Sequence, residues 1–303
     1  MAGLISRIAL LFWVGLLGVT GGQAADYATK FSNVGTIGNT RHNMTQRQSS
    51  GGGPVSAFMD NVRNDYGEIC VYCHTPHGAN TKISVPLWNR TIQTTTYTTY
   101  NQLGTATLTQ TVSQPGAASL SCLSCHDGQT AIDSIINMPG AGRYSAGQET
   151  TPDSGFLNTW TTGGQSGNYP ASAPGGGHNT LVECMNCHSA GPGSPATSFA
   201  SFVIGTDLRD DHPVGVPFPA DAPDFFQPGG TTAGLKFFDT NGNGRADKQD
   251  IRLYKTGSEY RVECASCHDP HGVPSGGPGS AFNKTFLRKT NETSGVCFTC
   301  HNK

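Results

Sequence analysis

The chain has 303 residues, among them 40 glycines and 18 prolines, and only 35% are hydrophobic and 13% charged. Apolar residues are too few to build one large aliphatic core in a chain of this length. Something other than Leu, Ile and Val must therefore organise the interior. The formal net charge of −2 provides neither a basic surface for nucleic acid nor a polybasic patch for a membrane, and we expect neither partner.

The first 24 residues have the pattern of a secretory signal peptide. Arg7 supplies a positive charge, residues 8–19 are apolar, and small residues stand at the two positions that the peptidase reads before residue 25. An apolar run this short does not cross a bilayer, and no cysteine precedes Cys70 to carry a lipid anchor. We therefore expect residues 1–24 to be removed and residues 25–303 to form one exported domain without a membrane anchor.

All ten cysteines belong to Cys-x-x-Cys-His motifs, which occur five times and are numbered here in chain order. This is the attachment signature of c-type haem. Two thiols about one helical turn apart can add to two vinyl groups of the macrocycle, and the adjacent histidine binds the iron. The cysteines are Cys70 and Cys73, Cys122 and Cys125, Cys184 and Cys187, Cys264 and Cys267, and Cys297 and Cys300. The proximal histidines are His74, His126, His188, His268 and His301.

Cysteines in this spacing have three other known uses. Exported cysteines often form disulfides, paired Cys-x-x-Cys motifs can bind zinc, and a single motif can be a thioredoxin-like redox pair. None of these uses requires a histidine directly after the second cysteine in all five motifs, with no cysteine left over. The sequence therefore predicts five covalently bound haem c groups.

The five histidines outside the motifs equal the irons in number. They are His42, His77, His178, His212 and His271. One further histidine per iron indicates that every haem has two histidine ligands and no open position for a substrate. Methionine is the competing axial ligand, and its candidates are Met44, Met59, Met138 and Met185.

Two of these histidines stand three residues after a proximal ligand. Motifs one and four both continue as His-x-Pro-His-Gly, which ends in His77 and His271, and each has a glutamate shortly upstream, Glu68 or Glu263. Three residues span at most roughly 10 Å, too little to pass around the edge of the flat ring to its far face. Each of these histidines should therefore bind a neighbouring haem, so that one short loop ties two irons together.

The chain resembles the multihaem c-type cytochromes that metal-respiring bacteria export. The likeness rests on Cys-x-x-Cys-His-x-Pro-His-Gly at 70–78 and 264–272, on Asp-His-Pro-Val at 211–214, and on Phe-Phe-Asp-Thr-Asn-Gly-Asn-Gly at 237–244. The resemblance implies that His212 is a distal ligand. Some members polymerise into extracellular filaments in which an N-terminal histidine binds a haem of the next subunit. By that resemblance the chain forms a homopolymer, with His42 ligating a haem in a neighbouring subunit.

Residues 239–250 fit the twelve-residue calcium loop, with oxygen side chains at positions 1, 3, 5, 9 and 12, a glycine at position 6 and a backbone carbonyl at position 7. Position 12 is aspartate rather than the usual glutamate, which weakens the expected chelate. An Asn/Gly-rich turn without metal is the alternative. A helix over Gln249–Tyr254 could follow the loop. The candidate calcium ligands are Asp239, Asn241, Asn243, Arg245, Asp247 and Asp250.

The expected fold is mostly irregular coil with short α-helices and a few short β-hairpins, a multihaem cytochrome c whose covalent haems form the core. We expect a short helix at each motif, with Asp60–His74 the longest. The alternating Thr and Tyr residues of Thr91–Thr111 predict a hairpin. The Gly/Pro-rich stretch Pro139–His178 predicts a long surface loop.

These features predict an electron-transfer protein rather than an enzyme. Closely spaced bis-histidine haems would exchange electrons with other redox proteins and with extracellular or periplasmic acceptors. An extracellular filament subunit is the favoured form, and a soluble periplasmic electron shuttle is the alternative. The rival from another class is a multihaem oxidoreductase with one open haem, against which the equal count of histidines argues.

Overall fold

The computed structural model describes residues 31–45, 66–92, 95–137, 180–185, 188–189 and 198–302. Regular secondary structure in these residues is sparse and short. The α-helices are α2 (Ala117–His126), α4 (Leu181–Cys184), α5 (Cys264–Cys267) and α6 (Cys297–Cys300). The 3-10 helices are η1 (Ile37–Asn39), η2 (Cys70–Tyr72), η3 (Tyr100–Gln102), η5 (Ala200–Phe202), η6 (Lys284–Phe286) and η7 (Glu292–Ser294).

A short helix forms at every Cys-x-x-Cys-His motif, as predicted: η2 at motif one, α2 at motif two, α4 at motif three, α5 at motif four and α6 at motif five. The longest of them is α2, which begins after Gly116 in an extended conformation. The prediction of a longest helix over Asp60–His74 is wrong for its described part, where only η2 forms. Residues 60–65 and the predicted loop Pro139–His178 lie outside the described residues.

The strands form one antiparallel sheet in the order β1-β5-β4-β3-β2. They are β1 (Val216–Pro217), β2 (Gly230–Thr232), β3 (Leu235–Phe237), β4 (Arg252–Thr256) and β5 (Glu259–Val262). Two-residue turns at 233–234 and 257–258 close the hairpins β2–β3 and β4–β5, because Thr232 pairs with Leu235 and Thr256 with Glu259. The predicted short hairpins therefore exist, but they lie between motifs three and four.

The hairpin predicted over Thr91–Thr111 is wrong. In the described part of that stretch, Thr98 makes only an isolated parallel bridge to Asp207. Tyr97 instead packs into a buried cluster with Leu123 and Leu208, and its hydroxyl donates to Asp127 at 2.8 Å. Burial of this aromatic side chain against α2 wins over local strand pairing.

The helix suggested for Gln249–Tyr254 is also wrong, because these residues lead into strand β4. Leu253 is buried while its neighbours Arg252 and Tyr254 are only partly covered, which is the two-residue period of a strand. The Gly257–Ser258 turn that follows is a hairpin signal that the sequence contained.

The apolar core is small and lies against the motifs. One cluster joins Tyr66, Val71, Tyr72 and Ile135, and Met44 and Cys73 pack against it. The other is the cluster of Tyr97, Leu123 and Leu208. Each contains a residue of a Cys-x-x-Cys-His helix, so the two apolar clusters lie at motifs one and two.

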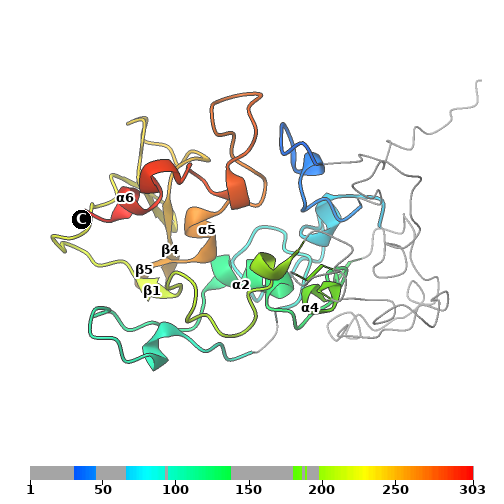
Figure 1. Cartoon of the computed structure of the whole chain (residues 1–303), viewed down its shortest axis with the longest axis horizontal. Coiled ribbons are helices and arrows are strands. Elements are labelled where there is room, and N and C mark those ends of the chain that lie inside the picture. The colour runs from blue at the N-terminus through cyan, green and yellow to red at the C-terminus, as the bar shows by residue number, and fades with distance from the viewer. Residues whose placement is uncertain are drawn as a thin grey trace, which may run out of the picture.

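The motif helices follow one another along the long axis of the molecule (Figure 1). Helix α6 lies near one end, α5 and α2 follow, and α4 lies toward the other end of the described part, while strand β4 of the sheet contacts α5. None of the helices in the described part of the chain has the length and apolar character needed to cross a membrane.

Candidate haem-binding sites

Three motif histidines are held by the same backbone arrangement. Each forms an isolated antiparallel bridge to a segment elsewhere in the chain, which we call its strap. The straps are residues 86–89 for motif one, 285–288 for motif four and 224–226 for motif five. The bridged pairs are His74 with Trp88, His268 with Leu287 and His301 with Phe225.

The backbone hydrogen bonds of the three straps correspond one to one. The residue after each histidine donates its N–H to the strap: Thr75 to Leu87 O, Asp269 to Phe286 O and Asn302 to Asp224 O, each at 2.8 Å. The strap donates back to the second cysteine of the motif: Asn89 to Cys73 O at 2.8 Å, Arg288 to Cys267 O at 2.7 Å and Phe226 to Cys300 O at 2.8 Å. The straps share no sequence pattern, since their bonds are all main-chain bonds. Sequence reasoning therefore missed them.

Six histidines have their Nδ1 atoms fixed by oxygen acceptors. A carbonyl or carboxylate oxygen can only accept a hydrogen bond, so Nδ1 carries the proton and Nε2 keeps the lone pair that binds a metal. For five of them the acceptor is a backbone carbonyl: Pro270 for His42 (3.1 Å), Pro86 for His74 (2.9 Å), Phe202 for His126 (2.6 Å), Pro213 for His212 (3.0 Å) and Thr285 for His268 (2.7 Å). For His271 it is the carboxylate of Asp269 (3.0 Å).

Three pairs of histidine rings face each other across the fold. The ring centroids of His42 and His126 are 6.3 Å apart, those of His74 and His271 are 6.2 Å apart, and those of His212 and His301 are 6.5 Å apart. Every pair joins one motif histidine to one histidine from outside the motifs. His271 thus faces the histidine of motif one, although it stands three residues after the histidine of motif four.

These separations match a metal held between two imidazoles. Two imidazoles that bind one metal from opposite sides, with metal–nitrogen bonds of about 2.0–2.1 Å and ring centroids about 1.1 Å behind the nitrogens, have centroids about 6.3 Å apart. Burial holds two of these rings neutral: it lowers the pKa of His42 to about 4, against a hydrogen bond to Pro270 O that raises it, and it lowers the pKa of His126. Neutral imidazole is the form that binds metal.

The remaining predicted ligands are placed less completely. His188 stacks on Phe199, with ring centroids 3.8 Å apart. His268 is oriented by its strap, and burial lowers its pKa. His77 is exposed, and its carbonyl accepts a hydrogen bond from Asn137. His178 and Cys187 lie outside the described residues.

The thiols show which motifs are neighbours. Cys125 of motif two lies close enough to Cys73 of motif one to raise its pKa, and Cys264 of motif four does the same to Cys122 of motif two. Cys297 of motif five likewise raises the pKa of Cys267 of motif four. The motifs are therefore adjacent in the order one, two, four, five.

Motif three joins this series beside motif two. A Cβ atom placed on Gly128, just after the motif-two histidine, would lie 2.3 Å from a methyl group of Val182 in α4. The guanidinium of Arg41 lies over the rings of both Phe199 and Phe202. Phe199 stacks on the motif-three histidine, and the backbone oxygen of Phe202 accepts a hydrogen bond from the motif-two histidine. These two residues therefore link the two sites.

The described thiols are neither paired in disulfides nor activated as redox nucleophiles. The nine cysteines that the structure describes form no disulfide with one another. Burial raises the pKa of Cys73 to about 12 and that of Cys264 and Cys267 to about 11, whereas a reactive redox thiol has a lowered pKa. A structural zinc site needs four ligands, and the described residues gather no group of three His, Cys, Asp or Glu side chains.

Two buried polar side chains next to the motifs have roles that the sequence did not predict. Arg90, only 1% exposed, donates to Ser124 O, Ala131 O and Ile132 O at 2.8–2.9 Å and so holds the end of α2 beside motif one. Glu263 caps the start of α5, and its carboxylate also accepts from Gly116 N at 3.1 Å and from the Ser119 hydroxyl. Glu263 therefore joins the first turns of α2 and α5.

The candidate calcium loop is closed by its own hydrogen bonds. Asp250, fully buried, accepts from the backbone and hydroxyl of Thr240 and from the Asp247 backbone. Asp239 accepts from the backbone N–H groups of Asn243 and Gly244. These are the bonds of an Asx-rich turn, and calcium binding by residues 239–250 stays a prediction.

No family model and no curated protein matches the chain.

Proposed function

We propose that the chain is a c-type cytochrome that carries five covalent haems and transfers electrons between them. The observation that carries this proposal is the set of three histidine pairs, His42–His126, His74–His271 and His212–His301, at 6.2–6.5 Å. Each pair has the separation of two axial ligands of one iron. Each also includes the histidine of a haem-attachment motif, so sequence and geometry point to the same atoms.

The residues have distinct roles in this proposal. The paired thiols of each motif form thioether bonds, and the motif histidine supplies the proximal nitrogen. When bound, each haem supplies an iron that takes up or releases one electron. The straps hold the proximal rings of motifs one, four and five, and the Nδ1 acceptors keep Nε2 directed at the metal.

The proposed distal ligands are His271 for haem one, His42 for haem two and His212 for haem five. Haems three and four then take His77 and His178 in one order or the other. His271 in this arrangement binds a haem of another motif, as its spacing from His268 requires. With two histidines per iron no position is open to a substrate, which favours electron transfer over an oxidoreductase.

The experiment that tests the proposal is a count of covalent haem. The exported protein is expected to retain five haems per chain after extraction with acidified acetone, which removes haem that is not covalently bound. Replacing Cys122 and Cys125 by alanine should lower the count to four, while replacing the nearby Ser121 and Ser124 by alanine should leave it at five. Zinc or disulfides in place of haem would refute the proposal.

A second proposal concerns how the protein works outside the cytoplasm. An extracellular filament subunit needs haems near both ends of the molecule, and the spread of α6, α5, α2 and α4 along the long axis favours this form (Figure 1). A soluble periplasmic shuttle is the alternative. His42 faces His126 of its own chain, which favours ligation within the chain over the ligation of a neighbouring subunit that the resemblance implied. Electron microscopy of the secreted protein distinguishes filaments from separate molecules.

A further inference from the structure

His271 differs from the other candidate iron ligands in the group that accepts its Nδ1 hydrogen bond, among the six histidines for which the structure gives this contact. His42, His74, His126, His212 and His268 each donate Nδ1–H to a neutral backbone carbonyl. His271 alone among these six donates to a carboxylate, Asp269 Oδ1, at 3.0 Å. The difference is chemical as well as geometric, because a carboxylate acceptor carries a full negative charge.

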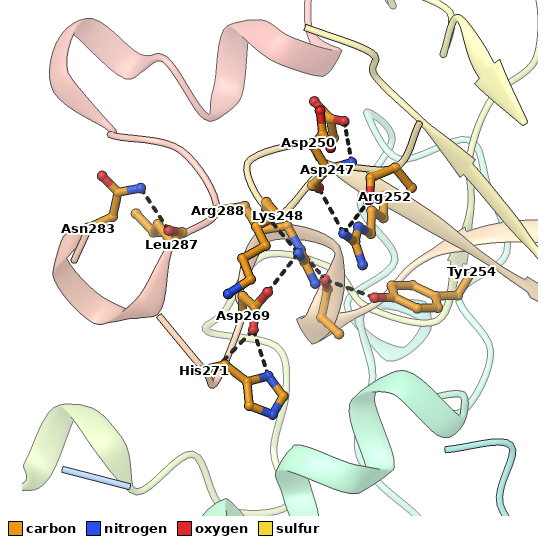
Figure 2. Close-up of polar contacts among 12 residues, drawn as sticks. Asp247, Lys248, Asp250, Arg252, Tyr254, Asp269, His271, Asn283, Leu287 and Arg288 are labelled. Carbon is orange, nitrogen blue, oxygen red and sulfur yellow. Dashed lines mark hydrogen bonds and ion pairs between the residues drawn. The ribbon is translucent and has the colours of Figure 1, made fainter. Parts of the chain in front are cut away.

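The carboxylate of Asp269 is held in place from several sides (Figure 2). Its residue is 7% exposed, and Oδ1 accepts from both the backbone N–H and the ring of His271. The buried Arg288 donates to the other oxygen, Oδ2, at 3.2 Å. Arg288 is itself fixed by Ala265 O and Lys248 O, each at 2.9 Å. Arg288 thus positions the carboxylate and leaves Oδ1 to His271.

We propose that Asp269 is a positioning residue that strengthens the bond from His271 Nε2 to the iron. Haem one then has a lower reduction potential than it would have without this carboxylate. This inference rests on the proposed function, with His74 and His271 as the ligands of haem one. A carboxylate draws the Nδ1 proton toward itself, and Nε2 becomes more basic. A more basic ligand stabilises oxidised over reduced iron.

The proposed effect involves no change of bonds. Reduction of haem one takes one electron from a neighbouring haem, which is oxidised in the same step, and the Nδ1 proton remains on His271. The effect of Asp269 is on the equilibrium of that exchange. With its lower potential, haem one would give up its electron readily to neighbouring haems. Electron transfer would then be favoured in the direction away from haem one.

The test is Asp269→Asn in the haem-loaded protein, with Asp127→Asn as the matched control. Asn keeps the size and the acceptor oxygen of Asp269 but removes the charge. Asp127 also directly follows a motif histidine and is 4% exposed, yet its carboxylate accepts from Tyr97 and Gln129 rather than from a histidine. Asp127→Asn therefore removes a buried charge near a haem without touching the Nδ1 atom of a ligand.

Two readouts decide the outcome, electron paramagnetic resonance (EPR) of the oxidised protein and a spectroscopic redox titration. Asp269→Asn should shift the equilibrium for reducing one haem at least tenfold toward the reduced form, which is about 59 mV for one electron. It should also weaken the ligand field of one low-spin EPR signal. Asp127→Asn should leave every ligand field unchanged. Unchanged spectra and potentials in Asp269→Asn, or the same ligand-field change in both variants, would overturn the inference.

A haem count on each sample separates this inference from the proposed function. Five haems with a silent Asp269→Asn variant would refute only the role of Asp269, whereas absence of haem in the wild type would refute the proposed function. If Asp269→Asn does not fold, the wild-type spectrum decides. One low-spin signal should then show a stronger ligand field than the others, and five alike would contradict the inference.

Discussion

At the scale of single residues, the Nδ1 atom of each histidine decides what its ring can do. Pro86 O and Thr285 O fix His74 and His268 through straps, and Pro270 O fixes His42 through the loop that follows motif four. An acceptor at Nδ1 leaves Nε2 as the base and limits rotation of the ring. These contacts prepare the rings for a metal in a way that the bare count of histidines does not reveal.

Removal of one distal ring should expose one iron. In His212→Ala, the ring that faces His301 at 6.5 Å is lost, so one haem should change from low-spin to high-spin in EPR while the other four stay low-spin. Added imidazole should restore the low-spin signal. The control is Tyr100→Phe, which removes the hydroxyl that donates to Asp211 O beside His212 and should leave all haems low-spin. A His212→Ala protein with an unchanged spectrum would refute this pairing.

At the scale of elements, the straps and the shared helix start give order to a chain with little regular structure. The three straps repeat one pattern of main-chain bonds at motifs one, four and five. Leu87 and Phe286 occupy equivalent strap positions, and both have positive φ, 54° and 59°. A left-handed conformation is costly for such residues, and its recurrence shows that the surrounding bonds enforce it.

The strap of motif five can be tested with a proline. Phe226→Pro removes the N–H that donates to Cys300 O, and we expect the free energy of unfolding to fall by about 1–3 kcal/mol. Phe226→Ala is the matched control, because it keeps the N–H and removes a side chain that is 47% exposed. Urea unfolding followed by circular dichroism measures both. Equal stability of the two variants would show that the strap bond contributes nothing.

Glu263 should make the junction of α2 and α5 sensitive to pH. Burial raises the pKa of this carboxyl above its ordinary value of 4.5, against hydrogen bonds from Ser119 and Gly116 that lower it. The folded state then binds the proton more tightly than the unfolded state, so this group's contribution to stability falls as pH rises above about 4.5. Glu263→Gln should lower the free energy of unfolding by about 1 kcal/mol, because the amide NH2 group replaces an oxygen that accepts a hydrogen bond. The difference in stability between this variant and the wild type should shrink with rising pH. Urea unfolding between pH 4.5 and 7 tests the sign, and a growing deficit would contradict it.

At the scale of the whole molecule, the loop after motif four joins three sites. His268 belongs to motif four, Asp269 binds His271 opposite His74 of motif one, and Pro270 O accepts from His42 opposite His126 of motif two. Four consecutive residues thus connect the candidate sites of haems one, two and four. Short connections of this kind keep redox centres close, which is what an electron-transfer chain needs.

Ligation of haem two by its own chain predicts a monomer that is complete at this site. Because His42 faces His126 within one chain, the low-spin spectrum should not change when the haem-loaded protein is diluted or when filaments are dissociated. His42→Ala should show one high-spin haem at every concentration. A wild-type high-spin signal that grows on dilution would instead show that His42 serves a neighbouring subunit.

Much of the helical architecture and none of the straps could be predicted from the sequence. Cys-x-x-Cys-His fixes a helical turn locally, and a short helix duly forms at each motif. The hairpin expected over Thr91–Thr111 failed because Tyr97 is buried against α2, a long-range effect. The three-residue spacing between His268 and His271 predicts that His271 pairs with the histidine of another motif. Only the three-dimensional arrangement identifies that histidine as His74.

The central claim, that each motif holds a haem between two histidines, is tested most directly by low-temperature EPR of the oxidised protein with haem counted on the same sample. The account predicts five covalent haems per chain, all low-spin, with no high-spin signal. A stoichiometric high-spin signal in the monomer would contradict it, because at least one iron would then lack its second histidine.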